Sequence, residues 1–600
     1  MSLGEQEGRR LRWLRAGFLA ALGLLLLALW NIQVGHGEQY ADNLERQSLR
    51  RVRIPGVRGR ILDRRGVCLA DNRPNYGIAL YLEELRNAQG RRVGASGIWQ
   101  AVASVSAVLG QPPQIDPSRI ADHLYSQKAL PLIAWRNLGP PALARLAESG
   151  ARLPGVDIVV EADRVYPEGP LLAHTLGYVG VADLAEEEDD LYHYYLPDLA
   201  GRTGLERHWD ATLAGRPGGR LVRVDVAGFK HDETALREPV PGGDLQLAVD
   251  ARIQREAEAA LEDAAGAAVV VDPRNGDVLA LASAPGFDPN AFSPRIGRAE
   301  WARLTGNPLK PLFPRALAGL YAPGSIFKPL VALAALGQGV SPEFAVDCPG
   351  YFELGNRRFA CYLNTAHGHV GFRRSLCVSC NTFYYQAGLA CGYDALVALA
   401  EAAGLGRKTG IDTGGEAAGL LPSRAWKRRV QGEAWRDGDT CNVAVGQGAL
   451  LVTPLQMAML AAALANGGTL YRPRLVLAVR DGPRAAFRPV PPAAVRRLPW
   501  SAAHLALVRT GLQDVIHAMD GSGRLARLDG IRMAGKTGTA EYGRKGEGRK
   551  HGWMIAYAPA DAPRYAVAIV LDDAVSGGLS VAPRVGGLMR RVFELEAGGS

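Results

Sequence analysis

A strongly hydrophobic stretch lies near the N-terminus of this chain. Residues 16–34, AGFLAALGLLLLALWNIQV, carry no charge, and four arginines stand just before them. A run of this length can cross a bilayer as one helix, and arginines keep their end of it in the cytoplasm. The alternative, a cleaved signal peptide, lacks a small-x-small cleavage site in the following GHGEQYADN. The pattern predicts a cytoplasmic tail at residues 1–15 and a retained transmembrane anchor at 16–34.

Between the anchor and the middle of the chain, the pattern changes from strand to helix and back. Residues 57–72 alternate apolar and polar positions around a central turn, which predicts a β-hairpin. From about residue 87 to 153 the period is helical, and strand and turn signals return at 201–228. Pro and Gly residues within 239–250 mark a boundary. We therefore expect an elongated, mostly-β region at 35–240 with a helical insertion.

The second half of the chain, residues 241–595, has the pattern of a sheet covered by helices. The segments that carry this pattern are a hairpin at 266–285, apolar helices that start near Ser325 and at Thr453, and strands at 532–541 and 564–573. Such a mixture predicts an antiparallel sheet with helices packed on it. The fold class expected for the whole chain is α+β.

The composition is that of a folded protein with more than one domain. The chain has 600 residues, of which 48% are hydrophobic and 22% charged, and one core does not fill a chain of this length. Its net charge of +9 comes from arginines scattered along the chain. Nucleic-acid-binding proteins instead concentrate their basic residues in one patch or arm. We therefore expect no nucleic-acid partner.

Candidate chemistry begins with Ser325 and Lys328, at the start of the apolar helix in APGSIFKPLVALAALGQG. The i, i+3 spacing places both side chains on one helical face. A serine hydroxyl becomes a nucleophile when a neighbouring base removes its proton, and lysine can be that base where burial lowers its pKa. The apolar residues that follow would supply this burial. Alone, the same spacing also fits a capping serine beside a solvated lysine.

Two later motifs strengthen the catalytic interpretation. SCN occupies residues 379–381, and KTGT occupies residues 536–539 in a strand-like segment. Taken singly, they could be a polar loop and a strand end. In this order after S-x-x-K, they form the signature of penicillin-binding proteins and β-lactamases.

The chain resembles a class B penicillin-binding protein over nearly its whole length. The similarity is carried by the anchor, the three motifs and the segments RGRILDRRG, GLERHWDATLAGRPG, VVVDPRNGDVLALASAPGFDPNAF and GQGALLVTPLQMA. The resemblance implies a single-pass inner-membrane protein whose bulk is periplasmic. It implies a pedestal of the dimerisation type at residues 35–240. It also implies a β-lactamase-like transpeptidase domain, an antiparallel sheet flanked by helices, at residues 241–595.

The activity implied by the resemblance is that of a peptidoglycan D,D-transpeptidase of rod elongation. Ser325 would attack the peptide bond between two D-alanines of a stem peptide and pass the acyl group to an amine of a neighbouring stem. β-Lactams would acylate the same serine. The resemblance also implies a SEDS-family glycosyltransferase and other elongation-complex proteins as partners.

The second motif receives its roles from the same resemblance. Ser379 would relay a proton between Lys328 and the leaving amine, and Asn381 would hold the substrate backbone. Many relatives of the rod-elongation subgroup carry Asp where this chain has Asn381. Because Asn is common in the wider family, we expect the activity to be retained.

The third motif would bind the donor peptide. Lys536, Thr537 and Thr539 would present a cation and two hydroxyls to the substrate carboxylate, and Gly538 would let its backbone come close. The backbone N–H groups of Ser325 and Thr539 would form the oxyanion hole.

A cluster of cysteines suggests a metal site. The ligand set Cys348, Cys361, His367 and Cys380 suits tetrahedral Zn²⁺, and these positions match the Asp, Asp, His and Cys zinc site of some rod-elongation relatives. Four protein ligands would make the zinc structural, and Cys380 would fix the SCN loop. The substitute ligands nearby are Cys377, His369 and Asp347. Disulfides and packed free thiols are the alternative interpretations.

Three other functions share parts of this pattern. A division-septum paralogue would have the same catalytic motifs, but the cysteine cluster and FACYLNTAHGHV favour elongation. A β-lactam sensor or β-lactamase would lack the region 35–240. An inactive scaffold that only activates a polymerase would not need Ser325 and Lys328.

Overall fold

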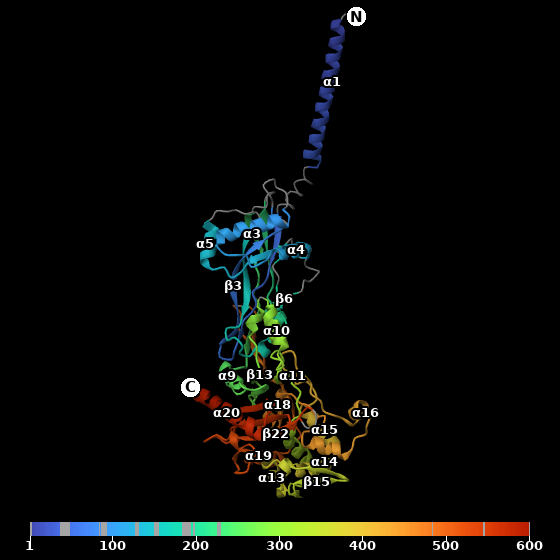
Figure 1. The fold of residues 1–600 in the computed structure, drawn as a ribbon, viewed down its shortest axis with the longest axis vertical. Helices are drawn as coiled ribbons and strands as arrows, with labels where there is room; N and C mark the ends of the chain where they lie inside the picture. The colour runs from blue at the N-terminus through green and yellow to red at the C-terminus, as the bar shows by residue number, and fades with distance from the viewer. Residues whose placement is uncertain are drawn as a thin grey trace.

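The computed structural model shows an N-terminal helix that projects from a long body (Figure 1). α1 (Leu3–Trp30) continues into the π-helical turn η1 (Asn31–Gly35). The segment Leu11–Gly35 has a mean hydropathy of 1.9, and its most apolar window has no buried residue. This agrees with the predicted anchor at 16–34. The structure describes residues 3–36, 49–82, 85, 93–126, 131–148, 155–182, 194–195, 198–224, 230–293, 295–482, 484–543 and 547–598.

Two sheets build the pedestal. The first, in the order β10-β9-β1-β7, consists of β1 (Leu49–Ile54), β7 (Tyr194–Tyr195), β9 (Gly218–Val224) and β10 (Lys230–Arg237). The second, in the order β20-β19-β11-β2-β3-β4 with β5 also paired to β3, consists of β2 (Ile61–Leu62), β3 (Cys68–Leu80), β4 (Leu132–Trp135), β5 (Val156–Val165), β11 (Asp244–Leu247), β19 (Val476–Arg480) and β20 (Arg488–Pro489). Antiparallel pairing of β2 with β3 confirms the hairpin expected at 57–72.

The second sheet continues across the boundary that the sequence suggests near residue 240. β11 pairs with β2 on one side and with β19, from the C-terminal half of the chain, on the other. The pedestal and the domain after it therefore share one sheet. Division of the chain at 240/241 stays a prediction.

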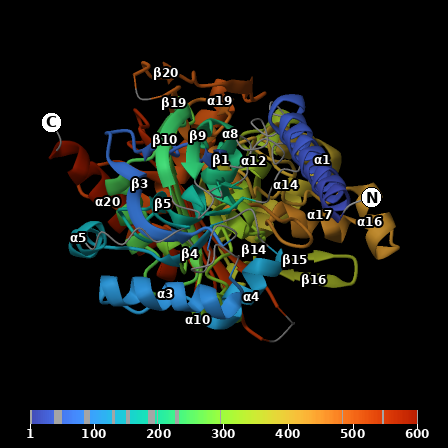
Figure 2. The same ribbon diagram turned by 90° about the horizontal axis from the view of Figure 1, so that it is seen from above.

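The helical insertion forms a small head beside the pedestal strands. Its helices are α3 (Ala95–Leu109), α4 (Pro117–Ser126) and α5 (Pro140–Glu148), and α3 and α4 lie along one side of the molecule in Figure 2. Ile98, Val102 and Val105 repeat at helical spacing and pack in one buried cluster with Trp135 of β4. Gly110 ends α3 with a φ of 67°, a conformation that glycine adopts without strain.

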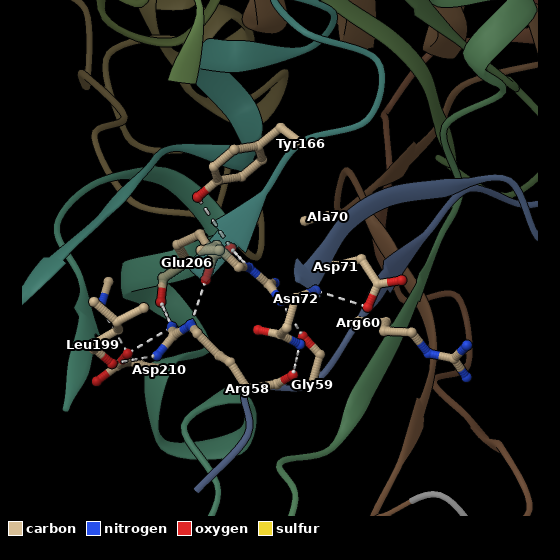
Figure 3. Close-up of polar contacts among 12 residues, drawn as sticks. Arg58, Gly59, Arg60, Ala70, Asp71, Asn72, Tyr166, Leu199, Glu206 and Asp210 are labelled. Atoms are coloured by element: carbon tan, nitrogen blue, oxygen red, sulfur yellow. Dashed lines mark hydrogen bonds and ion pairs between the residues drawn. The ribbon is translucent and has the colours of Figure 1, made fainter. Parts of the chain in front are cut away.

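A buried ion cluster joins three pedestal segments (Figure 3). Glu206, in α7 (Gly204–His208), accepts hydrogen bonds from Arg58 Nε and Arg164 Nε, each at 2.7 Å. Arg58 also pairs with Asp210 at 2.7 Å, and the hydroxyl of Tyr166 lies 3.3 Å from a carboxylate oxygen of Glu206. Because Arg58 and Glu206 belong to RGRILDRRG and GLERHWDATLAGRPG, the cluster ties these two distant segments together.

The remaining pedestal elements are short and lie around this cluster. They are α6 (Ala173–Leu176), β6 (Val179–Val181), β8 (Leu199–Gly201) and α8 (Asp210–Leu213).

The C-terminal domain is built on a five-stranded antiparallel sheet in the order β13-β12-β24-β23-β22. Its strands are β12 (Gly266–Val271), β13 (Val278–Ala284), β22 (Ala534–Glu541), β23 (Lys550–Ala558) and β24 (Tyr565–Leu571). Alternation along β12 sends Val269 and Val271 into one buried core and Ala268 and Val270 into another. The sheet confirms the hairpin at 266–285 and leaves β22 at an edge.

Helices cover both faces of this sheet. α18 (Pro454–Ala465) packs on one face, and α9 (Ala251–Ala259) and α20 (Ala582–Ala597) pack on the other. The other helices are α10 (Arg298–Gly306), α11 (Arg315–Ala318), α12 (Lys328–Gly337), α13 (Phe372–Cys377), α14 (Asn381–Cys391), α15 (Tyr393–Ala402), α16 (Arg424–Gln431), α17 (Asp437–Ala444) and α19 (Ala502–His517). The α+β class is confirmed.

Small two-stranded sheets complete the domain. The pairs are β14 (Ala345–Cys348) with β17 (Gly368–Gly371), β15 (Tyr351–Leu354) with β16 (Arg357–Ala360), and β18 (Thr469–Tyr471) with β21 (Ala494–Arg497).

Candidate active site

Ser325 lies in a tight turn just before the apolar helix. The α-helix was expected to start near Ser325, but α12 begins at Lys328, and Ser325 belongs to the 3₁₀ turn η4 (Gly324–Phe327). The reason is Pro329, which has no N–H to donate to the Ser325 carbonyl in an α-helical bond. The Lys328 N–H bonds that carbonyl instead. Residues three apart eclipse in a 3₁₀ turn, so the expected common face of Ser325 and Lys328 is kept.

Lys328 is fully buried and meets the second motif directly. Its Nζ donates to the Ser379 carbonyl oxygen at 2.7 Å, to Ser379 Oγ at 3.2 Å and to Asn381 Oδ1 at 2.7 Å. Burial lowers the pKa of Lys328 to about 8, although negative charge on the nearby Cys380 and Cys361 sulfurs acts in the opposite direction. At pH 7 about a tenth of an amine with this pKa is neutral and can accept a proton, far more than for an ordinary lysine.

Ser379 is held in a conformation that serine rarely adopts. It lies between α13 and α14 with a φ of 57°, the left-handed region, which costs a non-glycine residue of order 1 kcal/mol or more. In this conformation both its carbonyl oxygen and its hydroxyl reach Lys328 Nζ. The strained backbone therefore presents two acceptors of one residue to the same amine.

The KTGT motif, expected in a strand, occupies the edge strand β22. Lys536 is fully buried, and its Nζ donates to the Thr537 carbonyl at 3.1 Å. Burial, and after it the positive charge of Lys328, hold the pKa of Lys536 well below its usual range. The two lysines therefore lie close enough to repel each other. Thr537 Oγ1 and Thr539 Oγ1 are themselves hydrogen-bonded, to Ser522 Oγ at 2.9 Å and from the Gly577 N–H at 3.2 Å.

Glycines bring the first and third motifs into backbone contact. A Cβ atom at position 538 would lie 2.8 Å from the Pro323 carbonyl oxygen and 3.2 Å from the Ile326 nitrogen. Gly324 has a φ of 57°, and a Cβ there would lie 2.7 Å from the Thr539 carbonyl oxygen. Side chains at either position would separate the strand from the turn. The structure thus brings together Ser325, Lys328, Ser379, Asn381, Lys536, Thr537, Gly538 and Thr539.

Two supporting residues were not found from the sequence. Trp553 Nε1 donates to the Ala322 carbonyl at 3.1 Å, which fixes the chain just before Ser325. Trp553 stands opposite Gly538 in the β22–β23 register, and a large aromatic residue beside a strand glycine is a usable signal. Gly446 approaches the first motif, because the Gly324 N–H donates to its carbonyl at 2.8 Å. Its segment, GQGALLVTPLQMA, was noted only for its resemblance.

The four predicted metal ligands form a compact buried group. The ligand atoms of Cys348, Cys361, His367 and Cys380 all lie within 4.8 Å of one another. Cys361 Sγ is 3.7 Å from Cys380 Sγ and 3.4 Å from His367 Nδ1. Ligands about 2.3 Å from a tetrahedral metal are separated by about 3.8 Å. The donor set and its spacing therefore fit Zn²⁺.

The disulfide alternative for the cysteines fits the geometry less well. All seven cysteines are free thiols, and the 3.7 Å between Cys361 and Cys380 exceeds the about 2.05 Å of a disulfide. Cys377 lies beside Asp514 and Asp520. The exposed pair His369 and Asp347 is hydrogen-bonded at 3.2 Å. These three substitute ligands are outside the group that Cys348, Cys361, His367 and Cys380 form.

Chemically, the arrangement suits acyl transfer. A half-buried serine lies in a turn, three residues before a buried lysine with a lowered pKa. A second serine contacts that lysine, and an edge strand offers hydroxyls beside a second buried lysine. Groups of these kinds can supply a nucleophile, a base, a proton relay and a strand that binds a carboxylate.

Comparisons with known proteins agree with this chemistry. A family model described as penicillin binding protein transpeptidase domain matches residues 266–590, and one described as penicillin-binding protein dimerisation domain matches residues 53–247. The curated peptidoglycan D,D-transpeptidase MrdA of Acinetobacter baumannii is 31% identical over 94% of this chain and 85% of its own length.

Solved structures show the same similarity. The complex between penicillin-binding protein PBP2 and MreC from Helicobacter pylori matches with a TM-score of 0.77 and 25% identity, over 92% of this chain and 100% of that one. A peptidoglycan synthase complex that coordinates polymerization and crosslinking matches with a TM-score of 0.71 and 31% identity, over 98% of both chains.

Proposed function

Because this chain belongs to the penicillin-binding proteins, with a transpeptidase and a dimerisation domain, we propose that it acts through a serine acyl-enzyme. It is a peptidoglycan D,D-transpeptidase of rod elongation. Ser325 attacks the carbonyl between two D-alanines of a stem peptide, and the terminal D-alanine leaves. An amine of a neighbouring stem then takes the acyl group, which completes the cross-link and frees the serine.

The proton moves through the buried amine. Neutral Lys328 accepts the proton of Ser325 as the new bond forms. Ser379 Oγ, 3.2 Å from Lys328 Nζ, relays a proton to the departing D-alanine amine. Asn381 accepts from the same Nζ at 2.7 Å, so it holds the lysine as well as the substrate backbone. The N–H groups of Ser325 and Thr539 stabilise the oxyanion.

One observation carries this mechanism: Lys328 Nζ contacts Ser379 and Asn381 while it is fully buried. A fluorescent penicillin should label the purified chain, and labelling should disappear in Ser325→Ala. Labelling that persists in this variant would place the nucleophile elsewhere. A folded wild type that takes no label would support an inactive scaffold instead.

The position in the cell follows from the anchor and the family. We propose that α1 spans the inner membrane once and leaves the pedestal and the C-terminal domain in the periplasm. A SEDS-family glycan polymerase and the elongation proteins are the proposed partners; the similar H. pylori protein was solved with MreC. Depletion of the protein should make rod-shaped cells round, whereas filamentation would favour the division-septum alternative.

The cysteine group is proposed to hold one structural Zn²⁺. Cys348, Cys361, His367 and Cys380 would bind the metal as three thiolates and one imidazole, and the ion would stabilise the fold around the SCN loop without taking part in the reaction. Metal analysis should find about one zinc per chain in the wild type and none in Cys361→Ser, whose thermal midpoint should fall. Cys391→Ser, outside the group, is the control. A zinc-free wild type would contradict the proposal.

A further inference from the structure

A short loop after α19 reaches the third motif and is not part of the known signature. Ser522, in this loop, lies with its Oγ 2.9 Å from Thr537 Oγ1. Its backbone N–H donates to the Cys377 carbonyl at 3.2 Å, at the end of α13 and two residues before Ser379. One residue thus contacts both the segment that carries the proton relay and the strand that faces the substrate.

The loop is held in place by close backbone packing. A Cβ at position 521 would lie 2.4 Å from the Val515 carbonyl oxygen, and one at position 578 would lie 2.6 Å from the Ser522 carbonyl oxygen. The Gly577 N–H in turn donates to Thr539 Oγ1 at 3.2 Å. The backbone around Ser522 is therefore closely packed, and Ser522 and Gly577 each bond one threonine hydroxyl of the motif.

A count of protons shows what the pair of hydroxyls can do. Ser522 and Thr537 carry two hydroxyl protons, and one of them lies between the two oxygens. With Thr537 as the donor in this bond, the free proton is on Ser522; when both hydroxyls rotate so that Ser522 donates to Thr537 Oγ1, the free proton is on Thr537 and can go to a third group. Because Ser522 is half-buried, this group can come from the solvent side, and a carboxylate is the strongest acceptor that a stem peptide offers.

We propose that Ser522 is a positioning residue that orients Thr537 toward the terminal carboxylate of the donor stem peptide. It thereby makes the site selective for substrates that end in a free carboxylate. This inference rests on the proposed function, since the substrate is the D-Ala-D-Ala terminus. Ser522 acts through Thr537 and takes no part in the proton transfer at Ser325.

The test compares two acylating probes that differ only at the carboxylate. Second-order rate constants of acylation are measured for benzylpenicillin and for its methyl ester, on the full chain and on Ser522→Ala. In the variant, the rate constant for benzylpenicillin should fall by about tenfold or more, because a hydrogen bond to a charged group is weakened. The rate constant for the ester should fall by less than about twofold. Ser522→Thr, which keeps a hydroxyl, should restore most of the rate.

Two further variants keep the result unambiguous. Ser522→Cys nearly preserves the side-chain volume with a weaker donor, so it should show the same selective loss even if the alanine variant does not fold. Thr305→Ala loses a hydroxyl that bonds the Trp301 carbonyl of its own helix and should leave both rates unchanged.

Each remaining outcome has a distinct meaning. Equal losses with both probes, or no loss with benzylpenicillin, would overturn the role of Ser522. The proposed function would still stand in that case, provided that benzylpenicillin acylates the wild type. A wild type that benzylpenicillin does not acylate would overturn the proposed function and this inference with it.

Discussion

The pedestal and the active site both bury charged groups, with opposite consequences. In the pedestal, Glu206 is fully buried between two arginines; burial opposes its ionisation, but Arg164 and Arg58 outweigh this and lower its pKa. In the active site, Lys328 and Lys536 are equally buried, and among the described residues neither forms an ion pair. Burial there lowers the pKa of both lysines.

The difference separates a structural from a catalytic use of burial. A buried charge with opposite charges on both sides stays ionised, and its removal leaves the partners uncompensated. A buried amine with only neutral acceptors is brought near the pH at which it can gain and lose a proton. Burial therefore accompanies a charged cluster that joins pedestal segments in one region, and it lowers the pKa of a base in the other.

The largest expected effect comes from removal of the base. Lys328→Ala should lower the acylation rate constant for benzylpenicillin by about 10³-fold, because general-base catalysis is lost. Lys328→Arg should be just as slow, since an arginine keeps its proton at any accessible pH. Stopped-flow acylation measures both variants, and circular dichroism checks that they fold. An arginine variant with near wild-type rate would show that a charged group suffices.

Much of the catalytic architecture was predictable because it depends on local pattern. The segment around KTGT was predicted to be a strand, and the structure makes it the edge strand β22. The apolar run after Lys328 predicted the burial that lowers its pKa, which the structure shows. The helix start was wrong by three residues because the proline at 329 was not weighed as a missing hydrogen-bond donor.

The pedestal cluster could not be predicted in the same way. Arg58 and Glu206 are separated by 148 positions, and neither hydrophobic period nor charge spacing links such residues. The same holds for β2 and β11, which pair across the expected boundary, and for β11 and β19, which are also far apart in the sequence. Ser522 was missed because its partner, Thr537, is adjacent only through the fold. Long-range polar contacts were the part that the sequence could not supply.

The second-largest effect should come from removal of the carboxylate in the pedestal ion cluster. Glu206→Ala leaves Arg58 and Arg164 buried without their carboxylate and should lower the free energy of unfolding by about 3–5 kcal/mol. Urea denaturation of the purified chain measures this. Acylation by benzylpenicillin in the folded fraction should stay near the wild-type rate, because the cluster lies in the pedestal. A loss below about 1 kcal/mol would mean that the arginines find other partners.

The third effect is the pH dependence of acylation, which reports on the buried Lys328 of the active site. Since the pKa of Lys328 is about 8, acylation should rise about tenfold per pH unit below this value and level off above it. The folded chain holds fewer protons on this group than the unfolded chain between pH 8 and the ordinary pKa of 10.5. Its contribution to stability is therefore complete above pH 10.5 and lost as the pH falls through 8. A rate that is flat from pH 6 to 9 would contradict the assignment of Lys328 as base.

The smallest effect comes from an ion pair with the same geometry but no burial. Glu300 and Arg303 of α10 approach at 2.6 Å, as short as the 2.7 Å bonds of the pedestal cluster, yet Arg303 is 63% exposed. Solvent screens such a pair, and holding two long side chains together costs entropy. Arg303→Ala should therefore leave the urea midpoint unchanged within error. If it destabilised the chain as much as Glu206→Ala, distance rather than burial would govern these pairs, and the contrast between the two regions would need another cause.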